Sequence, residues 1–581
     1  MQRAVPRGPS APRRPLLLLL ACLSIAQGID EGVGRAACDD VPADLVEAAN
    51  LTIEEEAMLE KVCWREELAR EWRERGGLGA IPARDGIPAG VVCKKTLWCD
   101  RYKKTGICSE VCKPGTVRLD EWLVNAIRTQ VELASQLPFC YSQFSGTHNS
   151  AITLANGYGN RDLHFQQYFK FMKHMDADAK FETNDQWFSL TDQLNMGVRL
   201  VELDVHYVEH KLRIAHCGGI HSKPLDDLVK VLNVVAKLLG DHVFWDSETV
   251  GCQPSMSSIG VHDERLFRDA LQEIALWMNR TENQDQFVTI LLDAQMDIQQ
   301  WGKLHLLMNT ILEVFPKELI FTPPDVEAFF ESGPLPSFAQ MLALGRRILF
   351  IVDEEWSRDS WKLIFSNRHM CDWTEPSLGA LLVSPSCSCI VEQPGQPCDP
   401  TMYGQVMRVE TCELTYGVFD CGLHASDSDG PILDNVTLPR AYDCGINFPS
   451  PDLLTPQRAA ATIWSWAPGQ PQKNSTANGP MCVYISASDG RWRSQPCQAG
   501  LPTACRQVGH RPRWRWALEE SNDGGCPTGF VARAPRHALE NSALQRMLQG
   551  AGLAVARLEL ELPTPGREPM RKWGSPVVVE V

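Results

Sequence analysis

From Leu119 onward the sequence alternates stretches of helical periodicity with short, strongly apolar segments that predict β-strands. The clearest strands are expected at residues 198–207, 212–216, 287–293 and 347–352. Strands that alternate with helices form parallel sheets, because a parallel connection needs a long return path. The sequence therefore predicts an α/β fold whose parallel sheet is either open or closed into a barrel.

The amino terminus has the pattern of a secretory signal peptide. Four arginines precede an apolar run at 16–25, and small residues follow this run as far as Gly28. The run is too short to cross a bilayer as a helix. We predict cleavage near Gly28, which would remove residues 1–28 and one of the 21 cysteines, leaving an even number.

The cysteine pattern predicts disulfides and export from the cytosol. Four cysteines lie close together at loop-like spacings, which in an oxidising compartment more often mark bridges than zinc sites. They are Cys93, Cys99, Cys108 and Cys112. Four glycosylation sequons suit the same route, at Asn50, Asn279, Asn435 and Asn474. We expect a glycoprotein that is secreted or held in the lumen of the secretory pathway.

Composition narrows the classes of function. The 581 residues are 44% hydrophobic and 22% charged, which is typical of a globular chain rather than a disordered or multi-span membrane protein. The formal net charge of −16 disfavours sequence-independent binding to nucleic-acid phosphates. Nucleic acid is therefore not an expected partner.

We divide the rest of the chain into three regions. Residues 29–118 form a cysteine-containing accessory region with a charged helix near 53–75 and no catalytic constellation. Residues 119–455 form the α/β domain. Residues 456–581 form a tail rich in Trp and Cys, with a helix expected at 537–550.

Polar side chains gather at the predicted strand ends, where an α/β barrel builds its site. One cluster is the Ser-Gly-Thr-His-Asn-Ser sequence at 145–150. In the strand at 198–207, Glu202 and Asp204 share one face with His206, because strand side chains alternate. The opposite face is entirely branched aliphatic. For His206 a packing role is favoured over a functional one.

Two further strand ends add a histidine and a carboxylate. His216 follows the strand at 212–216, and Asp293 ends the strand at 287–293. Buried carboxylates need a cation or hydrogen-bond donors. An asparagine, Asn149, and three carboxylates without a thiolate favour a hard cation, so calcium is preferred over zinc, with magnesium as the second option.

These motifs resemble the catalytic X region of phosphoinositide-specific phospholipase C and its wider phosphodiesterase superfamily. The resemblance is carried by Gly-Thr-His-Asn-Ser at 146–150, by 197–204 with its Glu-X-Asp, and by the later His216. It extends over about 130–470. It implies a TIM-type (β/α) barrel that is distorted or incompletely closed.

The resemblance also implies roles for particular residues. His148 and His216 match the two catalytic histidines, and Glu202 is a second candidate for proton transfer. The calcium ligands would be Asn149, Glu202, Asp204 and Asp293. The strand at 348–353 lacks the lysines with which family members hold extra ring phosphates, which argues against a polyphosphorylated inositide as substrate.

The tail is similar to the closing half of a C-type lectin domain, from Trp464 to Cys505. It departs from that pattern where Arg493 and Ser494 replace the Asn-Asp pair that binds calcium and sugar there. A structural role is therefore favoured over sugar binding. Arginines interleaved with Trp514 and Trp516 suggest a peripheral lipid contact, although inward-packed indoles are the favoured interpretation.

The sequence thus predicts a secreted, calcium-dependent phosphodiesterase of the phospholipase C type. Its substrate would be a phosphatidylinositol-like phospholipid or a related phosphodiester. Two alternatives stay open: a phospholipase D-like or glycerophosphodiester-cleaving enzyme, and a non-catalytic extracellular protein that binds a glycan or a surface.

Overall fold

The computed structural model describes residues 84–99, 108–162, 183–208, 210–215, 259, 263–294, 297–300, 302–329, 335–352, 360–375, 378, 406–411, 432–472, 481–498, 500–508, 516–519 and 525–560. The predicted signal peptide and the predicted helix near 53–75 lie outside these residues. None of the described helices is both long and apolar enough to cross a bilayer.

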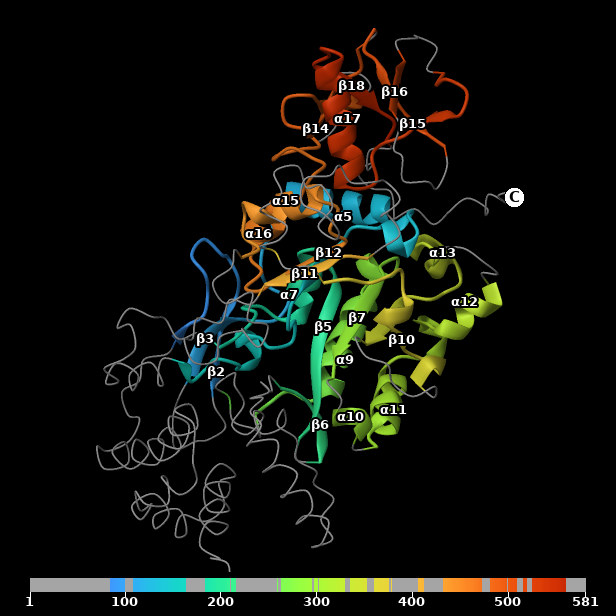
Figure 1. The fold of residues 1–581 in the computed structure, drawn as a ribbon. Coiled ribbons are helices and arrows are strands. Elements are labelled where there is room, and N and C mark those ends of the chain that lie inside the picture. The colour runs from blue at the N-terminus through green and yellow to red at the C-terminus, as the bar shows by residue number, and fades with distance from the viewer. Residues whose placement is uncertain are drawn as a thin grey trace, which may run out of the picture.

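A parallel sheet forms the centre of the molecule (Figure 1). Its strands are β4 (Ser145–Thr147), β5 (Val198–Val208), β7 (Val288–Asp293), β9 (Ile348–Val352) and β10 (Phe365–Ser366), in the order β10-β9-β7-β5-β4. A short strand, β8 (Ile320–Phe321), also pairs with β9. All of these pairings are parallel. The predicted α/β class with a parallel sheet is confirmed.

Helices cover the outer face of this sheet. They include α7 (Leu190–Asn195), α9 (Phe267–Met278), α10 (Asp297–Gln300) and α11 (Leu304–Val314). The branched aliphatic residues of β5, such as Val201 and Leu203, pack against them in one buried cluster. Further helices are α12 (Pro323–Phe329) and α13 (Phe338–Ala343), which starts with a capping box at Ser337 and Gln340.

The inner face of the sheet holds a second, aromatic-rich cluster. Leu200, Leu291 and Leu349 contribute from β5, β7 and β9, together with several phenylalanines. The alternation predicted for the strand at 198–207 is therefore seen, with Leu200 and Glu202 on the inner side. The apolar cluster supports the polar strand ends, because it fills the inner space below them.

A second parallel pair, β11 (Arg408–Thr411) and β12 (Phe448–Pro451), continues the inner face beyond β4. The amide of Phe144 donates to the carbonyl of Asn447 at 2.8 Å, so β12 lies beside β4. On the other side of β11, Thr374 bridges to Met407. Ladder pairing from these residues to β10 is not present among the described strands. A closed TIM barrel is therefore not seen among the described strands, and the expectation of a distorted or incompletely closed barrel stays a prediction.

The strand expected at 212–216 differs from the prediction. β6 (Lys211–Ile214) pairs antiparallel with the far end of β5, so the two form a hairpin. Alternation alone did not reveal this hairpin, although the connection between the two expected strands is too short for a parallel crossover and was itself a signal for an antiparallel pair. The other three predicted strands occur as β5, β7 and β9.

The accessory region contributes a small sheet in the order β1-β3-β2. The strands are β1 (Arg84–Asp85), β2 (Lys95–Cys99) and β3 (Cys108–Cys112). Two disulfides brace it, Cys93–Cys112 and Cys99–Cys108. The prediction that these four cysteines form bridges is confirmed.

The tail folds around a second sheet in the order β14-β13-β18-β15-β16, with β17 beside β15. Its strands are β13 (Met481–Ser486), β14 (Trp492–Pro496), β15 (Thr503–Gln507), β16 (Trp516–Glu519), β17 (Phe530–Ala532) and β18 (Val555–Leu558). The helix predicted at 537–550 is α17 (Ala538–Gly550), with His537 as its N-cap. Helices α15 (Thr437–Asp443) and α16 (Pro456–Ala461) precede this module.

Helix α5 (Glu121–Ser135) joins the tail to the α/β domain. Its residues Leu123 and Ile127 belong to the same buried cluster as Trp466 and Trp492 of the tail. Ile127 also contacts Gly197, directly before β5. The tail therefore sits at the amino-terminal end of the parallel strands, at the top of Figure 1. The expected domain boundaries, at 118/119 and 455/456, stay a prediction.

Three more disulfides are present among the described residues. Two close loops within the tail, Cys482–Cys497 and Cys505–Cys526. The third, Cys140–Cys371, spans 231 residues of the α/β domain. The five disulfides between described cysteines fit a protein that folds in an oxidising, extracellular-type environment.

Candidate functional site

The carboxyl ends of β4 and β5 bring the first predicted site residues together. His148 and Asn149 follow β4 directly, and Asn149 has φ 41°, a left-handed conformation that asparagine tolerates. The amide of Asn149 donates to Glu202 Oε2 at 3.0 Å. Ser150 adds two hydrogen bonds with the backbone of Glu202. This loop is therefore fixed on the strand that carries the carboxylates.

The His148 side chain is held by a carboxylate that the sequence analysis missed. Its Nδ1 lies 2.8 Å from Oδ1 of Asp452, and Asp452 is the residue that directly follows β12. Burial alone would lower the pKa of His148, but Asp452, Glu410 and Glu202 raise it well above its usual value. These carboxylates therefore favour the protonated imidazole, and its Nε2 makes no hydrogen bond to the described residues.

Glu202 is bound from across the inner face by a second missed residue, Arg408 on β11. The Arg408 guanidinium is almost fully buried and pairs with Glu202, Glu410 and Glu375. Burial raises the pKa of Glu202 to about 7, although Arg408 opposes the shift. Glu202 thus pairs with the Arg408 guanidinium through Oε2, and its Oε1 makes no hydrogen bond to described residues.

Asp204 and Asp293 lie side by side, because they are partners in the β5–β7 register. Asp204 is buried, and its Oδ1 has no hydrogen-bond partner among the described residues. Burial and the neighbouring Asp293 and Glu202 raise the pKa of Asp204 well above its usual value. A buried carboxylate among like charges stays ionised only beside a cation. These residues fit an oxygen-bound divalent ion.

The carboxylates nearest to His148 are not all those that were predicted. The ligand atoms of His148, Glu202 and Glu410 lie within 4.8 Å of one another. Those of His148, Asp185 and Asp452 form a second such group. Asp204 and Asp293 belong to neither group, so the predicted calcium ligand set stays a prediction.

His216 lies outside the described residues. The chain is described as far as Ala215, whose amide donates to the carbonyl of Asp204 at 3.2 Å. The preceding strand β6 thus runs back toward the carboxylate cluster. The predicted role of His216 stays a prediction.

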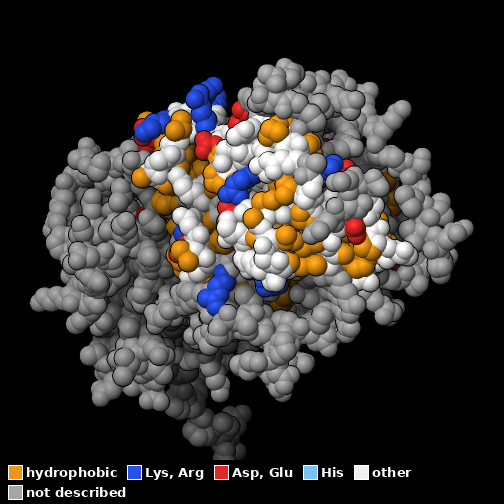
Figure 2. All heavy atoms as spheres, turned by 90° about the horizontal axis from the view of Figure 1, so that it is seen from above, with side chains coloured by type: hydrophobic (Ala, Val, Ile, Leu, Met, Phe, Trp, Pro, Cys, Tyr) orange, Lys and Arg blue, Asp and Glu red, His pale blue; other side chains and the backbone are white. Residues whose placement is uncertain are grey.

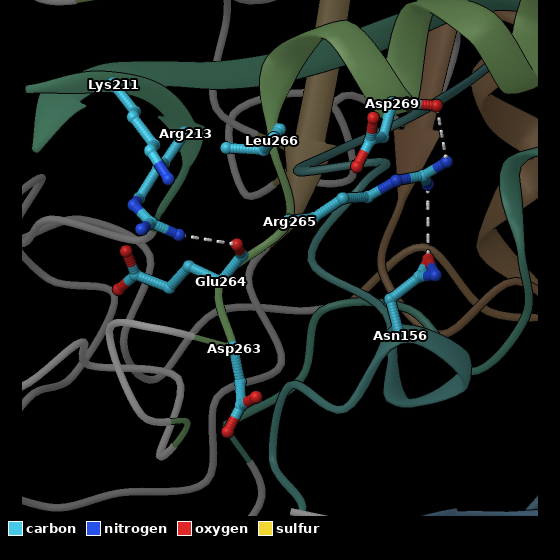
Figure 3. Close-up of a pocket in the computed structure, with 8 residues that line it drawn as sticks. All are labelled: Asn156, Lys211, Arg213, Asp263, Glu264, Arg265, Leu266 and Asp269. Carbon is cyan, nitrogen blue, oxygen red and sulfur yellow. Dashed lines mark hydrogen bonds between the residues drawn. The ribbon is translucent and has the colours of Figure 1, made fainter. Parts of the chain in front are cut away.

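A cavity of about 310 Å³ lies next to β6 (Figure 3). Its lining is charge-balanced, with three basic and three acidic side chains beside Asn156 and Leu266. Arg213 donates to the carbonyl of Glu264, and Arg265 donates to Asn156, as the dashed lines show. With both arginines turned to internal partners and its charges balanced, this cavity is not specialised for an anion.

Ser494, at which the tail departs from the lectin pattern, is hydrogen-bonded within the tail. The Ser494 hydroxyl donates to Gln470 Oε1 at 2.9 Å and accepts from the amide of Gln472. Internal hydrogen bonds thus engage the position where the lectin pattern has a calcium and sugar ligand. Arg506 pairs with Glu540, and Trp516 is buried. Because Arg506 is paired and Trp516 is buried, these two residues are unsuited to lipid contact. Trp514 lies outside the described residues.

The described surface at the tail end is mixed in character. Seen along this direction, apolar and uncharged side chains alternate with scattered basic and acidic ones (Figure 2). Such a surface has no concentrated basic field of the kind that attracts anionic lipid. The predicted lipid contact of the tail gains no support from it.

Fold and site together define an α/β chain with a histidine–carboxylate site at the carboxyl ends of parallel strands. No family model matches the chain. It is 24% identical over 408 residues to an uncharacterised protein of Mycobacterium tuberculosis, covering 68% of this chain and 70% of that protein.

Two shorter matches concern parts of the chain. The maintenance of telomere capping protein 6 of Eremothecium gossypii is 32% identical over 99 residues, which is 15% of this chain and 22% of that protein. The C-type mannose receptor 2 of Rattus norvegicus is 32% identical over 111 residues, which is 19% of this chain and 6% of the receptor.

Among solved structures, a phosphatidylinositol-specific phospholipase C from Listeria monocytogenes is similar to part of this chain. The alignment covers 58% of this chain and 98% of the phospholipase chain, at 10% identity and a TM-score of 0.30.

Proposed function

We propose that this protein is a divalent-cation-dependent phosphodiesterase of the phospholipase C type, with a phosphatidylinositol-like or related phosphodiester as substrate. The observation that carries the proposal is the His148–Asp452 pair beside Glu202, Asp204 and Asp293. An imidazolium next to a cation-binding carboxylate cluster is suited to the charge that develops on phosphoryl oxygens. The motif resemblance described above supports the same reaction class.

Calcium would be held by Asn149, Glu202, Asp204 and Asp293, with magnesium as the second option. When bound, such an ion stabilises negative charge on a phosphoryl oxygen. His148 would donate to those oxygens through Nε2, since its Nδ1 is engaged by Asp452. His216 would protonate the leaving alcohol oxygen, and Glu202 or Asp293 would accept the proton of the attacking hydroxyl.

The purified mature chain should be incubated with phosphatidylinositol, sphingomyelin, lysolipid and glycerophosphodiester substrates, with calcium or with a chelator. Release of diacylglycerol or another phosphate-free alcohol, lost on chelation, is the expected result. A phosphatidate or a free head-group alcohol would instead indicate the phospholipase D-like or glycerophosphodiester-cleaving alternative. No turnover, together with glycan-array binding, would indicate a non-catalytic binding protein.

Leaving-group chemistry separates the roles of His216 and Asp204. His216→Ala should lose about 10²- to 10⁴-fold in turnover on an alkyl leaving group, but much less on a nitrophenolate that departs without a proton. Asp204→Asn should be impaired on both substrates and should bind calcium more weakly, as titration calorimetry would show. Equal defects of His216→Ala on both substrates would remove it as the acid.

We also propose that the protein works outside the cytosol. The signal-like amino terminus and the five disulfides support export. Expression in cultured eukaryotic cells should place the protein in the medium or the secretory lumen, with a mass decrease after removal of N-linked glycans. A chain found only in the cytosol with free thiols would contradict this.

A further inference from the structure

The small sheet β1-β3-β2 and its flanks carry positive charge in an otherwise acidic chain. Residues 94–118 contain seven Lys or Arg and two Asp or Glu, whereas the whole protein has a net charge of −16. Such a local reversal of sign indicates a surface that attracts an anionic partner.

Three of these cations lie together on neighbouring strands. Lys95 is the register partner of Cys112, and the amide of Lys113 donates to the carbonyl of Lys94 at 2.8 Å. All three lysines are exposed. Glu110, the one acidic residue among the described residues 108–118, pairs with Lys95, so the remaining charge of this cluster is positive.

Exposed apolar side chains stand beside the lysines. Leu97 on β2 is 59% exposed and Val92 is 58% exposed. Because strand residues alternate, Leu97 shares the outward face of β2 with Lys95. The two disulfides restrain the backbone of this sheet, so the backbone does not need to become ordered when a partner binds.

The inward face of the same strand fixes the sheet to the α/β domain. Trp98 packs so closely on Gly157 that a side chain there would collide with the indole. Ser109 on β3 donates to Asn160 at 2.6 Å. Both contacts are made to the segment that follows the His148 loop. β2 and β3 therefore flank the α/β domain at its side, to the left of β5 in Figure 1.

We propose that the exposed end of this sheet, with Lys95 and Leu97 on the outward face of β2 and with Val92, Lys94 and Lys113 beside the start of that strand, binds an anionic lipid surface. Clustered lysines are attracted to acidic head groups, and the two apolar side chains enter the boundary between head groups and acyl chains. A purely polyanionic partner would leave Leu97 and Val92 without a role. The proposal does not depend on the proposed catalytic activity, because it concerns binding alone.

The test is co-sedimentation of the full mature chain with vesicles of phosphatidylcholine, with or without phosphatidylserine. Binding should require phosphatidylserine and should weaken as salt rises. The triple variant Lys94→Glu, Lys95→Glu, Lys113→Glu should bind about 100-fold more weakly. Leu97→Ser should weaken binding by about 5- to 10-fold.

A matched control reverses three exposed charges elsewhere, at Lys317, Arg546 and Arg557. This variant has the same net charge as the first, and it should keep vesicle binding within about threefold of wild type. Thermal unfolding of every variant checks the fold. Turnover of a water-soluble phosphodiester separates loss of lipid binding from loss of activity.

Three results would overturn the proposal. One is vesicle binding that is equal with and without phosphatidylserine. Another is an equal loss of binding in the two triple variants, which would show a net-charge effect. The third is retention on a sulfated polysaccharide without binding to any vesicle, which would assign the face to a polyanion instead of a membrane.

Discussion

His148 is held both at its imidazole ring and at its backbone carbonyl. Asp452 contacts Nδ1, and the Gln186 side chain donates to the backbone carbonyl of His148 at 2.8 Å. Gln186 also donates to the carbonyl of Pro451, next to Asp452. A single glutamine thus couples the loop after β4 to the end of β12, and it sets the distance between the histidine and its carboxylate.

Removal of the Asp452 charge tests this arrangement. We expect Asp452→Asn to lower turnover by about 10²- to 10³-fold, because the histidine loses the charge that orients it and keeps it cationic. Steady-state kinetics would measure the loss, and Asp489→Asn, a surface carboxylate of the tail, is the matched control. Turnover unchanged in Asp452→Asn would mean that the pair only contributes to packing.

The sequence predicted candidate site residues where a polar motif follows or interrupts an apolar strand. His148, Asn149, Glu202 and Asp204 could be placed because they belong to recognisable strand ends. Asp452 was missed because β12 has the sequence Phe-Pro-Ser-Pro, and two prolines argue against a strand. Arg408 and Glu410 were missed because their four-residue strand lies in a stretch whose cysteines and prolines suggested loops.

At the scale of elements, β4 and β12 approach each other unusually closely. A Cβ on Gly146 would lie 2.4 Å from the Oγ of buried Ser450. Glycine therefore fits on β4 at this point, because a Cβ would collide with the Ser450 hydroxyl unless that hydroxyl moved. His148 and Asp452 follow directly after these strands, so the spacing of the pair depends on the contact.

We therefore expect Gly146→Ala to cost about 1–3 kcal/mol of stability and to lower turnover as well. Ser450→Ala removes the colliding oxygen, so the double variant should recover most of both losses. Chemical denaturation and kinetics on the four proteins of this cycle would measure the coupling. Additive effects of the two substitutions would contradict a direct collision.

The first turn of α17 contains a buried network of charges. His537 caps the helix, and Glu540 pairs with Arg536 and Arg506. Burial lowers the pKa of His537 to about 4, despite the neighbouring Glu540. Although burial alone would raise it, the arginines hold the pKa of Glu540 at about 2. Both shifts disfavour the protonated side chain in the folded protein.

These shifts predict acid sensitivity. Below the ordinary histidine pKa of about 6.5 the unfolded chain gains a proton at His537, while the folded chain gains it only near pH 4. Stability should therefore fall between these values, by roughly 2–3 kcal/mol at pH 4.5. Denaturation at pH 7 and pH 4.5 should show a smaller fall in His537→Asn, which keeps a capping side chain. An equal fall in both proteins would contradict this.

At the scale of the whole molecule, the tail and the α/β domain share a core. Gln130 on α5 accepts from the amides of Trp464 and Ser465 and donates to the carbonyl of Thr462. Trp466 donates its indole N–H to Thr129. The joint between the two parts is thus both apolar and hydrogen-bonded, and the parts should unfold together.

Calorimetry tests that expectation. The wild-type chain should unfold in one transition, and Gln130→Met should lower its stability by about 2–4 kcal/mol while leaving a single transition, because the joint is part of the core. Gln549→Met, at a more exposed position on α17, is the matched control. Two well-separated transitions in the wild type would show that the tail is an independent domain.

Local pattern predicted the elements but not this joint. The strands at 198–208, 288–293 and 348–352 and the helix at 538–550 follow from periodicity. Periodicity could not show what α5 packs against, because the residues that contact this helix lie more than 300 positions away in the sequence. Barrel closure was likewise beyond prediction, since it depends on pairing between short segments in a region of irregular composition.

The shared core also limits how this architecture can evolve. A tail that rested on a flexible linker could be lost or exchanged as a cassette without consequence for the rest of the chain. Here, loss of the tail would expose Leu123, Ala126 and Ile127, which are buried against it or beside it. A descendant without the tail would have to acquire polar residues at these positions, so the sequence of one helix near the start of the α/β domain should report whether a lectin-like module follows.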